Sequence, residues 1–401
     1  MKILRIISSV DPKGGGVIEG VRQLQEPLVR MGHDVDIACC DAPDAPWLCA
    51  SEEGLNIYAL GPSRFGYAFT SRLLPWLRKN VANYDAVIVE GIWQYHSFAV
   101  WLALAGKSTP YFVFTHGMLD PWFKRNYPLK HLKKCLYWPW AEYRVLRDAR
   151  SVIFTCEEER LLARKSFWRT QWQEAISGYG TASAPTNGDE LARRFLVANP
   201  DLGGKRVLLY LSRIHEKKGC DLLIAAFAKV AFLDPALHLV IAGPDQTGLV
   251  PRLQRQSKEL GVSHRISWLG MLQGDEKWGA FHAAEVFCLP SHQENFGIVV
   301  AEALACATPV LISNKVNIWR EIEGDGAGFV SDDTIEGTVD NLRRWINTTG
   351  YQKEGMGRAG LVSFQNRYQI DKVADSLIRI ISEHNVDTSS NFKNQKDPVI
   401  K

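Results

Sequence analysis

Long hydrophobic runs, a strong net charge and the common metal motifs are all missing from this chain of 401 residues. Because no run of about 18 uncharged apolar residues occurs, we expect no transmembrane helix. A net charge of only +3 gives no overall basic field of the kind that attracts nucleic acid. With 46% hydrophobic and 23% charged residues, the composition excludes a mainly disordered chain and fits a globular protein.

The eight cysteines form no CxxC pair, and none stands beside histidine at zinc-finger spacing. Most lie inside apolar runs, which indicates buried free thiols and a reducing compartment. The opening MKILRIISSV leads into Asp11-Pro12 without a small-residue cleavage site, so we expect a first strand rather than a signal peptide. These features favour a cytoplasmic protein.

Metal, dinucleotide and ATP motifs are also absent. There is no HExxH and no EF-hand loop, and the DxD of Asp34 and Asp36 begins an expected strand, so we predict no metal site. The glycines Gly14, Gly15 and Gly16 follow the first strand without forming G-x-G-x-x-G or GxxxxGK[ST]. Such a run permits close backbone approach to a bound group, and it also fits a mobile turn.

Short apolar runs do alternate with helical patterns along the chain. Runs that are apolar nearly throughout are typical of parallel strands covered on both faces, and the alternation indicates doubly wound α/β domains. The strands predicted in this way are 3–8, 35–39, 86–89, 111–115, 151–155, 206–211, 238–242, 266–269, 286–289 and 309–312. Helices are predicted between them, for example over 20–31 and 221–232.

The alternation restarts at residue 206, after a stretch rich in glycine, proline and polar residues, and this divides the chain into two similar domains. An amphipathic pattern over 371–381 predicts a final helix, and we expect it to pack back on the first domain. The predicted parts are a first domain over 1–180, a linker over 181–204 with a short helix near 191–197, a second domain over 205–385 and a flexible tail over 386–401.

The segment SHQENFGIVVAEALACATPV follows an apolar strand in the second domain. A helix beginning near Gly297 would leave free backbone amides around 295–298, and a helix start of this kind attracts anions. Glu294 would lie on the loop beside that anion. Glu302 would lie more than one turn inside the helix, where a polyol such as ribose suits it better. The same spacing also fits two solvent-facing glutamates.

A second polar cluster, in LYLSRIHEKKGCDLLIAAF, places cations at the carboxyl end of a strand, where open α/β sheets bind ligands. Arg213 and Lys218 are suited to clamping a diphosphate, the first bidentately and the second as a point charge. A solvated basic turn is the alternative. His116 follows the apolar run YFVFT, so it either faces a ligand or hydrogen-bonds within its own loop.

Residues 122–150 carry eight Lys or Arg against two acidic residues, interleaved with Trp and Tyr. This pattern suits an anionic bilayer, stacking on sugars or nucleic acid, or two helices packed through their aromatics with a solvated basic face. We favour peripheral contact with an anionic membrane, and we expect an acceptor contact at the same place. The residues predicted for it are Lys130, Lys133, Lys134 and Trp138.

The chain resembles the retaining glycosyltransferases of family 4 in the glycine run and in LYLSRIHEKKG, HLVIAGPD, WLG and VFCLPSHQENFGIVVAEALACATPV. The resemblance extends to about residue 385 and is most specific over 206–325. Arg-x₄-Lys and Glu-x₇-Glu, in that order, are its strongest elements. It implies the GT-B fold, in which two Rossmann-like, doubly wound parallel-sheet domains face each other across a cleft.

The resemblance also implies roles for single residues. Arg213 and Lys218 would hold the donor diphosphate, Glu294 the donor sugar and Glu302 the nucleotide ribose, while His116 would lie near the donor sugar. The catalytic residues implied are therefore His116, Arg213, Lys218 and Glu294. The donor-binding residues implied are Gly15, Gly16, Arg213, Lys218, Asn295, Phe296, Gly297, Ile298 and Glu302.

The implied activity is metal-independent, cofactor-free transfer of a hexosyl unit from a UDP- or GDP-linked sugar to a glycan or lipid-linked acceptor. The HGMLDPW segment looks like that of bacterial exopolysaccharide or cell-wall transferases, which implies polysaccharide biosynthesis at the inner face of the plasma membrane. Nucleic acid is not an expected partner. Alternatives on the same fold are a sugar-nucleotide epimerase, a phosphorylase and a non-catalytic sugar-nucleotide-binding protein.

Overall fold

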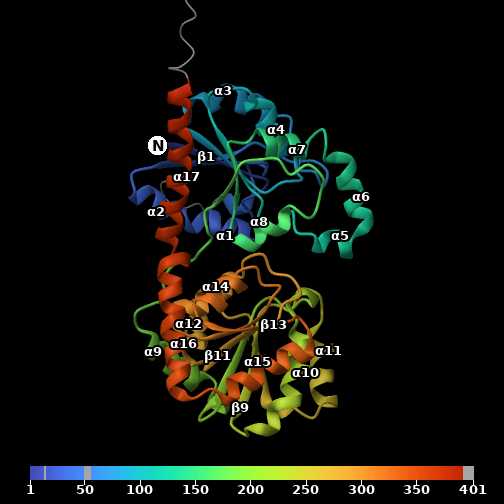
Figure 1. Ribbon diagram of the computed structural model, residues 1–401, viewed down its shortest axis with the longest axis vertical. Coiled ribbons are helices and arrows are strands. Elements are labelled where there is room, and N and C mark those ends of the chain that lie inside the picture. Colours follow the sequence, from blue (N-terminus) through green and yellow to red (C-terminus); the bar gives the residue numbers. More distant parts are fainter. Residues whose placement is uncertain (13–14, 49–55, 392–401) are drawn as a thin grey trace, which may run out of the picture. The chain divides into compact units, whose positions relative to one another are not determined.

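The computed structural model describes residues 1–12, 15–48 and 56–391, with side chains up to residue 383. It contains two compact units (Figure 1). The first consists of Met1–Tyr179 and the chain from Ile370 onward, and the second of Gly180–Gln369. Each unit has its own parallel sheet with helices on both faces, which confirms the predicted α/β class.

The sheet of the first unit has seven parallel strands in the order β3-β2-β1-β4-β5-β6-β7. From β1 the chain adds strands first on one side and then, beginning with β4, on the other, so the order reverses between β1 and β4. The strands are β1 Lys2–Ile7, β2 Asp34–Cys39, β3 Ile57–Ala59, β4 Ala86–Glu90, β5 Tyr111–Phe114, β6 Ser151–Phe154 and β7 Glu174–Ile176.

Helices cover both faces of this sheet, which explains why its central strands are apolar nearly throughout. Along β1, Leu4 and Ile6 face a core shared with α3, α4 and α7, whereas Ile3 faces a second core shared with α2 and α17. In β4, Val87 and Ile88 alternate in the same way. The helices are α1 Gly16–Gln23, α2 Gln25–Arg30, α3 Leu73–Asn80, α4 Tyr95–Leu104, α5 Trp122–Asn126, α6 Pro128–Tyr137, α7 Glu142–Asp148, α8 Glu157–Ala163 and α17 Ile370–Asn391.

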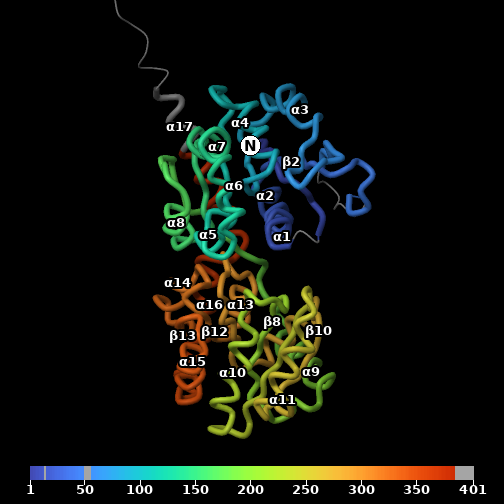
Figure 2. Tube along the Cα trace, turned by 90° about the vertical axis from the view of Figure 1, so that its right-hand side faces the viewer, coloured from blue at the N-terminus to red at the C-terminus, as the bar shows by residue number. Residues whose placement is uncertain are grey.

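The sheet of the second unit has six parallel strands in the order β10-β9-β8-β11-β12-β13, and this order reverses between β8 and β11. In Figure 2 the labelled strands of this sheet run from β13 at the left through β12 and β8 to β10 at the right. The strands are β8 Arg206–Leu211, β9 Leu237–Ala242, β10 Ile266–Gly270, β11 Val286–Leu289, β12 Val310–Ser313 and β13 Gly328–Ser331. The helices are α9 Gly188–Ala198, α10 Cys220–Val230, α11 Val250–Glu259, α12 Gly274–Ala283, α13 Ile298–Ala305, α14 Trp319–Gly324, α15 Ile335–Asn347 and α16 Gly350–Ser363.

Each predicted strand is present, but three further strands were not predicted. These are β3, β7 and β13, and all three lie at the edge of a sheet. Edge strands are covered less completely, so β3 (IYA) and β7 (EAI) are three residues long and lack a continuous apolar run. The seven cysteines in the described residues are free thiols, five of them buried, as their apolar surroundings predicted.

The division between the units differs from the predicted one in the segment predicted as a linker, whereas the last helix packs on the first unit as expected. The segment predicted as a linker, 181–204, contains α9, which packs against α12, so it forms part of the second unit. The chain returns to the first unit at Ile370, where α17 joins the core beside α2. This helix continues to Asn391, beyond the predicted start of the tail, and 392–401 lie outside the described residues.

Glu142, at the start of α7, is a carboxyl group enclosed in the core of the first unit. Ser97 donates a hydrogen bond to its Oε1 at 2.9 Å, whereas its Oε2 has no partner among the described residues. Burial disfavours the charged form and raises the pKa of Glu142 to about 7. The folded protein therefore holds a proton there that the unfolded chain releases near pH 4.5.

We expect the substitution Glu142→Gln to stabilise the protein, relative to wild type, more at pH 8 than at pH 5. Since the pKa is raised on folding, the stability that this carboxyl contributes is complete below about pH 4.5 and is lost as the pH rises through about 7. A shift of that size corresponds to roughly 3 kcal/mol. Urea unfolding at both pH values measures the difference, and Glu26→Gln, at an exposed carboxylate of α2, is the control. A difference that does not change with pH would contradict the expectation.

Candidate functional site

The predicted polar clusters lie where parallel strands end beside the two points of order reversal. In the second unit, Arg213 and Lys218 follow β8 and Glu294 follows β11, the two strands that flank the reversal. In the first unit, Gly15 follows β1, and His116 follows β5. Carboxyl ends of strands beside such a reversal are the usual ligand sites of open α/β sheets.

The Lys218 ammonium contacts the carboxylate of Glu294, so the structure brings together two residues separated by 75 others in the sequence. The two side chains are only 10% and 19% exposed. Burial and the nearby cations Arg213 and Lys217 lower the pKa of Lys218 to about 7, an effect that the contact with Glu294 opposes. This lysine is therefore a cation whose charge depends on its neighbours.

A tight backbone approach holds the lysine loop against the end of β11. Lys218 closes a short 3₁₀ turn, Glu216–Lys218, in which His215 Nδ1 accepts a hydrogen bond from the amide of Lys217 at 3.1 Å. Gly219 follows with φ +66°, and a Cβ there would lie 2.1 Å from the carbonyl oxygen of Pro290. Only glycine fits this position, and the turn delivers Lys218 to the loop that carries Glu294.

Arg213 is exposed, and its guanidinium donates to Oε1 of Gln246 at 3.2 Å. Its charge acts on Lys218, which places the two cations in one electrostatic neighbourhood. No ion pair of Arg213 is present among the described residues. Its guanidinium therefore remains available to an anion.

The helix α13 begins as predicted, with Gly297 as its N-cap at φ +78°. The backbone amides of Gly297 and Ile298 have no hydrogen-bond partner within the described part of the chain. The Phe296 side chain is buried against Tyr368, so Phe296 offers a ligand only its backbone. The start of this helix is thus a partly positive surface beside Glu294.

Glu302 lies one turn further along α13 and makes a separate ion pair. Its Oε1 accepts from Lys277 Nζ, on α12, at 2.8 Å, and its side chain is 6% exposed. A solvent-facing Glu302, the alternative left open by the spacing, is therefore wrong. Lys277 was not predicted, because a single lysine in a helical pattern gives no signal of this pairing.

In the first unit, His116 lies beside a buried ion pair that also was not predicted. His116 Nε2 is 2.7 Å from Oε2 of Glu90, the last residue of β4, and Arg5 of β1 contacts the other carboxylate oxygen at 2.6 Å. The edge of the Tyr179 ring meets the His116 ring, and the Tyr179 hydroxyl donates to the carbonyl of Gly16. The histidine and the glycine run are thus linked through Tyr179.

Gly15 is the N-cap of α1, with φ +82°, and Gly14 lies outside the described residues. The DxD sequence is structural, since Asp36 is buried and accepts hydrogen bonds from Tyr84 at 2.7 Å and from Asn56 at 2.9 Å. Among the described residues, no group of three His, Cys, Asp or Glu side chains comes together as a metal-binding cluster.

The structure overturns one of the four predicted membrane contacts, Trp138. Trp138 is fully buried, its ring stacks on Phe167 at 4.4 Å between centroids, and its indole N–H donates to the carbonyl of Trp168. Lys134 is half-buried, with Nζ 4.4 Å from the centre of the Trp93 ring, and burial lowers its pKa to about 8. Trp138 and Tyr143 therefore pack in a core, as one of the alternatives had it, whereas Tyr127 and Trp140 are exposed.

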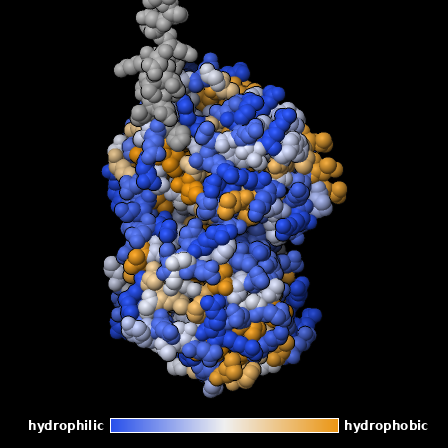
Figure 3. Space-filling view, in the orientation of Figure 1, coloured by the Kyte–Doolittle hydropathy of each residue, from blue (hydrophilic) through white to orange (hydrophobic). Residues whose placement is uncertain are grey.

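The outer face of α6 nevertheless exposes apolar side chains. Leu129, Leu132 and Leu136 are 82%, 60% and 72% exposed, and Lys130 and Lys133 lie exposed between them. Figure 3 shows apolar side chains gathered at this edge of the first unit. Within the described ranges, no helix is both long enough and apolar enough to span a bilayer.

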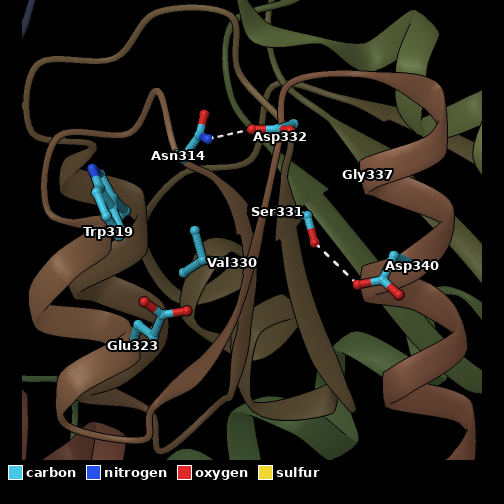
Figure 4. Close-up of a pocket in the computed structure, with 8 residues that line it drawn as sticks. All are labelled: Asn314, Trp319, Glu323, Val330, Ser331, Asp332, Gly337 and Asp340. Carbon is cyan, nitrogen blue, oxygen red and sulfur yellow. Dashed lines mark hydrogen bonds between the residues drawn. The ribbon is translucent and has the colours of Figure 1, made fainter.

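A pocket of about 400 Å³ lies in the second unit. Figure 4 shows its lining residues between α14, β13 and α15. The pocket contains none of the predicted donor-binding residues. Some of the polar side chains that line it are hydrogen-bonded to one another: Asn314 donates to Asp332 at 2.5 Å. The lining residues are Asn314, Trp319, Glu323, Val330, Ser331, Asp332, Gly337 and Asp340.

Solved structures of low sequence identity share this fold. HepE from Anabaena, solved with UDP and glucose, superposes with a TM-score of 0.73 at 17% identity, covering 96% of this chain and 100% of that one. A sucrose-phosphate synthase from Thermosynechococcus elongatus gives a TM-score of 0.73 at 20% identity, covering 96% and 98%. These likenesses show the GT-B architecture of the chain.

Curated relatives include D-inositol 3-phosphate glycosyltransferases. The one from Stackebrandtia nassauensis is 37% identical over 200 residues, which is 48% of this chain and 44% of the relative. The one from Segniliparus rotundus is 28% identical over 202 residues, 48% of this chain and 42% of the relative. The matched region spans less than half the length of these relatives.

Family models match both units in turn. The model described as "Glycosyl transferase 4-like domain" matches residues 15–175, and the one described as "Glycosyl transferases group 1" matches residues 194–361. The two matches together take in most of the chain, in the order of its two sheets. The chain therefore belongs to the family 4 glycosyltransferases with the GT-B fold.

Proposed function

We propose that the protein transfers a hexosyl unit from a nucleotide-diphosphate sugar to a glycan or lipid-linked acceptor, with retention of the anomeric configuration. The observation that carries this proposal is the contact of Lys218 with Glu294, with Arg213 nearby, beside the start of α13. Two cations, a carboxylate and unpaired amides at the ends of β8 and β11 match the chemical groups of a sugar diphosphate.

The chemical step follows from the charge that develops on the leaving group. When the bond between the anomeric carbon and the diphosphate breaks, negative charge builds on the diphosphate, and Arg213, Lys218 and the start of α13 stabilise it. The anomeric carbon becomes electron-poor, as in glycosidases. The proposed reaction needs no metal and no cofactor, because the protein itself supplies the positive charge.

Glu294 is proposed to bind the hydroxyls of the donor sugar, with the amides of 295–298 beside it. Glu302 is proposed to bind the ribose, with Lys277 holding its carboxylate in place. His116, Gly15 and Gly16 are proposed to contribute from the first unit, near the donor sugar and its phosphate. Attack on the front face of the sugar would retain the configuration, and we assign no protein nucleophile.

The nucleotide and the sugar are chosen for testing from the names of similar proteins. HepE was solved with UDP-glucose, at 18% identity to this chain, which makes UDP-glucose the first donor to test and a GDP-linked hexose the second. We propose an acceptor in polysaccharide biosynthesis. Labelled donor with and without acceptor separates transfer from epimerisation, phosphorolysis and simple binding, since only transfer places label on the acceptor.

We expect Arg213→Ala and Lys218→Ala each to reduce kcat/KM for transfer by about 100-fold or more, the usual effect of removing one electrostatic donor from a transition state. Initial rates with labelled donor, in buffer containing EDTA, measure this. Lys229→Ala, at an exposed lysine of α10, is the control and should keep wild-type turnover. Wild-type rates in both active-site variants would remove the diphosphate clamp, and loss of wild-type activity in EDTA would indicate a metal requirement.

We expect the affinity for UDP, or for GDP where that is the nucleotide bound, to fall by up to about tenfold for each pH unit above the pKa of Lys218. Burial and the cations Arg213 and Lys217 lower that pKa, and a bound diphosphate favours the charged form of Lys218, so binding at a pH where the free lysine is neutral must take up a proton. Phosphate ionisation of the nucleotide is already complete in this range.

Calorimetry at several pH values, in buffers of different ionisation enthalpy, measures both the dissociation constant and the proton uptake. Lys218→Arg is the matched control, because its guanidinium stays charged and its affinity should not fall with pH in this way. An equal pH slope for wild type and Lys218→Arg would assign the titration to another group.

We further propose that α6 docks on an anionic membrane, with the three exposed leucines in the headgroup region and Lys130 and Lys133 beside the lipid phosphates. We expect Leu129→Ser combined with Leu132→Ser to lower co-sedimentation with phosphatidylglycerol vesicles, and Lys130→Gln with Lys133→Gln to lower it chiefly at low salt. Val197→Ser, at an 81% exposed position of α9, is the control. Unchanged co-sedimentation of the leucine variant would contradict membrane docking.

A further inference from the structure

We propose that Glu90 is a positioning residue that fixes which ring nitrogen of His116 meets the donor sugar. This inference rests on the proposed function, since it gives His116 its orientation in that reaction. Glu90 touches no proposed ligand, and it acts only through the histidine. The proposal is carried by a chain of buried contacts across three adjacent strands, β1, β4 and β5.

The contacts of Glu90 use both of its carboxylate oxygens. Oε1 accepts two hydrogen bonds from Arg5, from Nε at 2.8 Å and from Nη2 at 2.6 Å, and Oε2 lies 2.7 Å from Nε2 of His116. The Glu90 side chain has no exposed surface, and that of Arg5 has 2%. Arg5 is anchored in turn, because its Nη1 donates to the carbonyl of Val21 at 3.2 Å.

The ion pair keeps Glu90 negatively charged. Burial alone would raise the pKa of Glu90, but the charge of Arg5, helped by the hydrogen bond from His116, outweighs it and lowers the pKa to about 2. An ionised carboxylate can only accept hydrogen bonds. Nε2 of His116 must therefore carry a hydrogen, whatever the charge on the ring.

The second ring nitrogen is then the one available to a ligand. In neutral His116 the unprotonated nitrogen is Nδ1, an acceptor, and it has no hydrogen-bond partner among the described residues. The ring stacks on Phe114, with 5.4 Å between centroids, and the Tyr179 ring meets it edge-on at 6.0 Å. Packed on these sides, with 6% of its side chain exposed, the ring has little freedom to turn. Nδ1 is suited to accept a hydrogen bond from a sugar hydroxyl.

The backbone around His116 is held from the opposite side. His116 and Gly117 both have positive φ, +47° and +73°, and a histidine in this region is uncommon. Glu159 Oε1 accepts from the Gly117 amide at 2.5 Å and from the Thr115 hydroxyl at 2.6 Å. Glu159 thus holds the backbone, and Glu90 holds the ring. Because two buried carboxylates maintain this uncommon backbone conformation, we infer that the orientation of the His116 side chain matters for function.

The first experiment uses the wild-type protein, with Glu90 and Arg5 unchanged. ¹⁵N-labelled histidine in the full-length protein reports the protonation of each ring nitrogen, and the variant His116→Asn assigns the signal of His116. We expect neutral His116 to be protonated at Nε2 only. A neutral ring protonated at Nδ1 instead of Nε2, or a mixture of the two neutral forms, would overturn the proposal without any assay of activity.

The second experiment compares Glu90→Gln with wild type. The amide of glutamine can accept from Nε2 or donate to it, so the single tautomer should be lost. We expect kcat to fall about 10- to 100-fold, the usual cost of losing such a supporting contact, with the donor KM changed less than about threefold. Glu142→Gln, at another buried carboxylate of the first unit, is the control and should keep wild-type kcat.

The outcomes separate this inference from the proposed function. If wild type transfers no sugar but His116 shows Nε2 protonation that Glu90→Gln disturbs, the transferase proposal fails and the positioning contact stands. If wild type is active and Glu90→Gln keeps both its kcat and its tautomer, the positioning role is wrong. Should Glu90→Gln not fold, because Arg5 is left unpaired in the core, the wild-type spectrum alone decides the question.

Discussion

The reversal of strand order in each sheet is the constraint on which the rest of this structure depends. A chain that winds outward from β1, and then restarts at β4 on the other side, sends successive connections away from each other at the carboxyl ends of those strands. The same holds for β8 and β11. Polar loops are tolerated there, since the helices that cover both faces leave the strand ends open. Motif residues far apart in the sequence, such as Lys218 and Glu294, come together for this reason.

Several buried charges among the described residues form ion pairs, and the pairing decides what each can do. A lone charge inside a protein costs several kcal/mol, so Arg5 and Glu90 are found together, as are Lys277 and Glu302. Glu142 forms no ion pair within the described ranges, and burial raises its pKa instead. The core of the first unit thus shows both responses to burial: a paired carboxylate that stays ionised and an unpaired one that holds a proton.

Much of the fold could be predicted because a buried parallel strand needs an apolar run, and such runs are visible in one sequence. The edge strands β3, β7 and β13 could not, since partial cover removes the signal. The residues of the Arg-x₄-Lys and Glu-x₇-Glu patterns could be named, but their partners could not. The pairing of Glu302 with Lys277 depends on how α12 and α13 pack against each other, and the spacing of residues in the sequence does not predict this packing. A charged residue within an apolar strand, as Arg5 is in KILRII, was a signal that could have been used.

Each unit has an ion pair at the same topological position, and the two pairs differ in how far they are enclosed. In the first unit a cation from β1 meets a carboxylate at the end of β4, and in the second a cation after β8 meets a carboxylate after β11. Arg5 and Glu90 are almost fully enclosed, so neither can exchange its partner for a ligand, and their charge serves the neighbouring His116. Lys218 and Glu294 keep some exposed surface, and Lys218 lies near a second cation. In the proposed reaction a diphosphate would replace the carboxylate as the partner of Lys218 and release Glu294 for the sugar, so we propose ligand binding for the more open pair and positioning for the closed one.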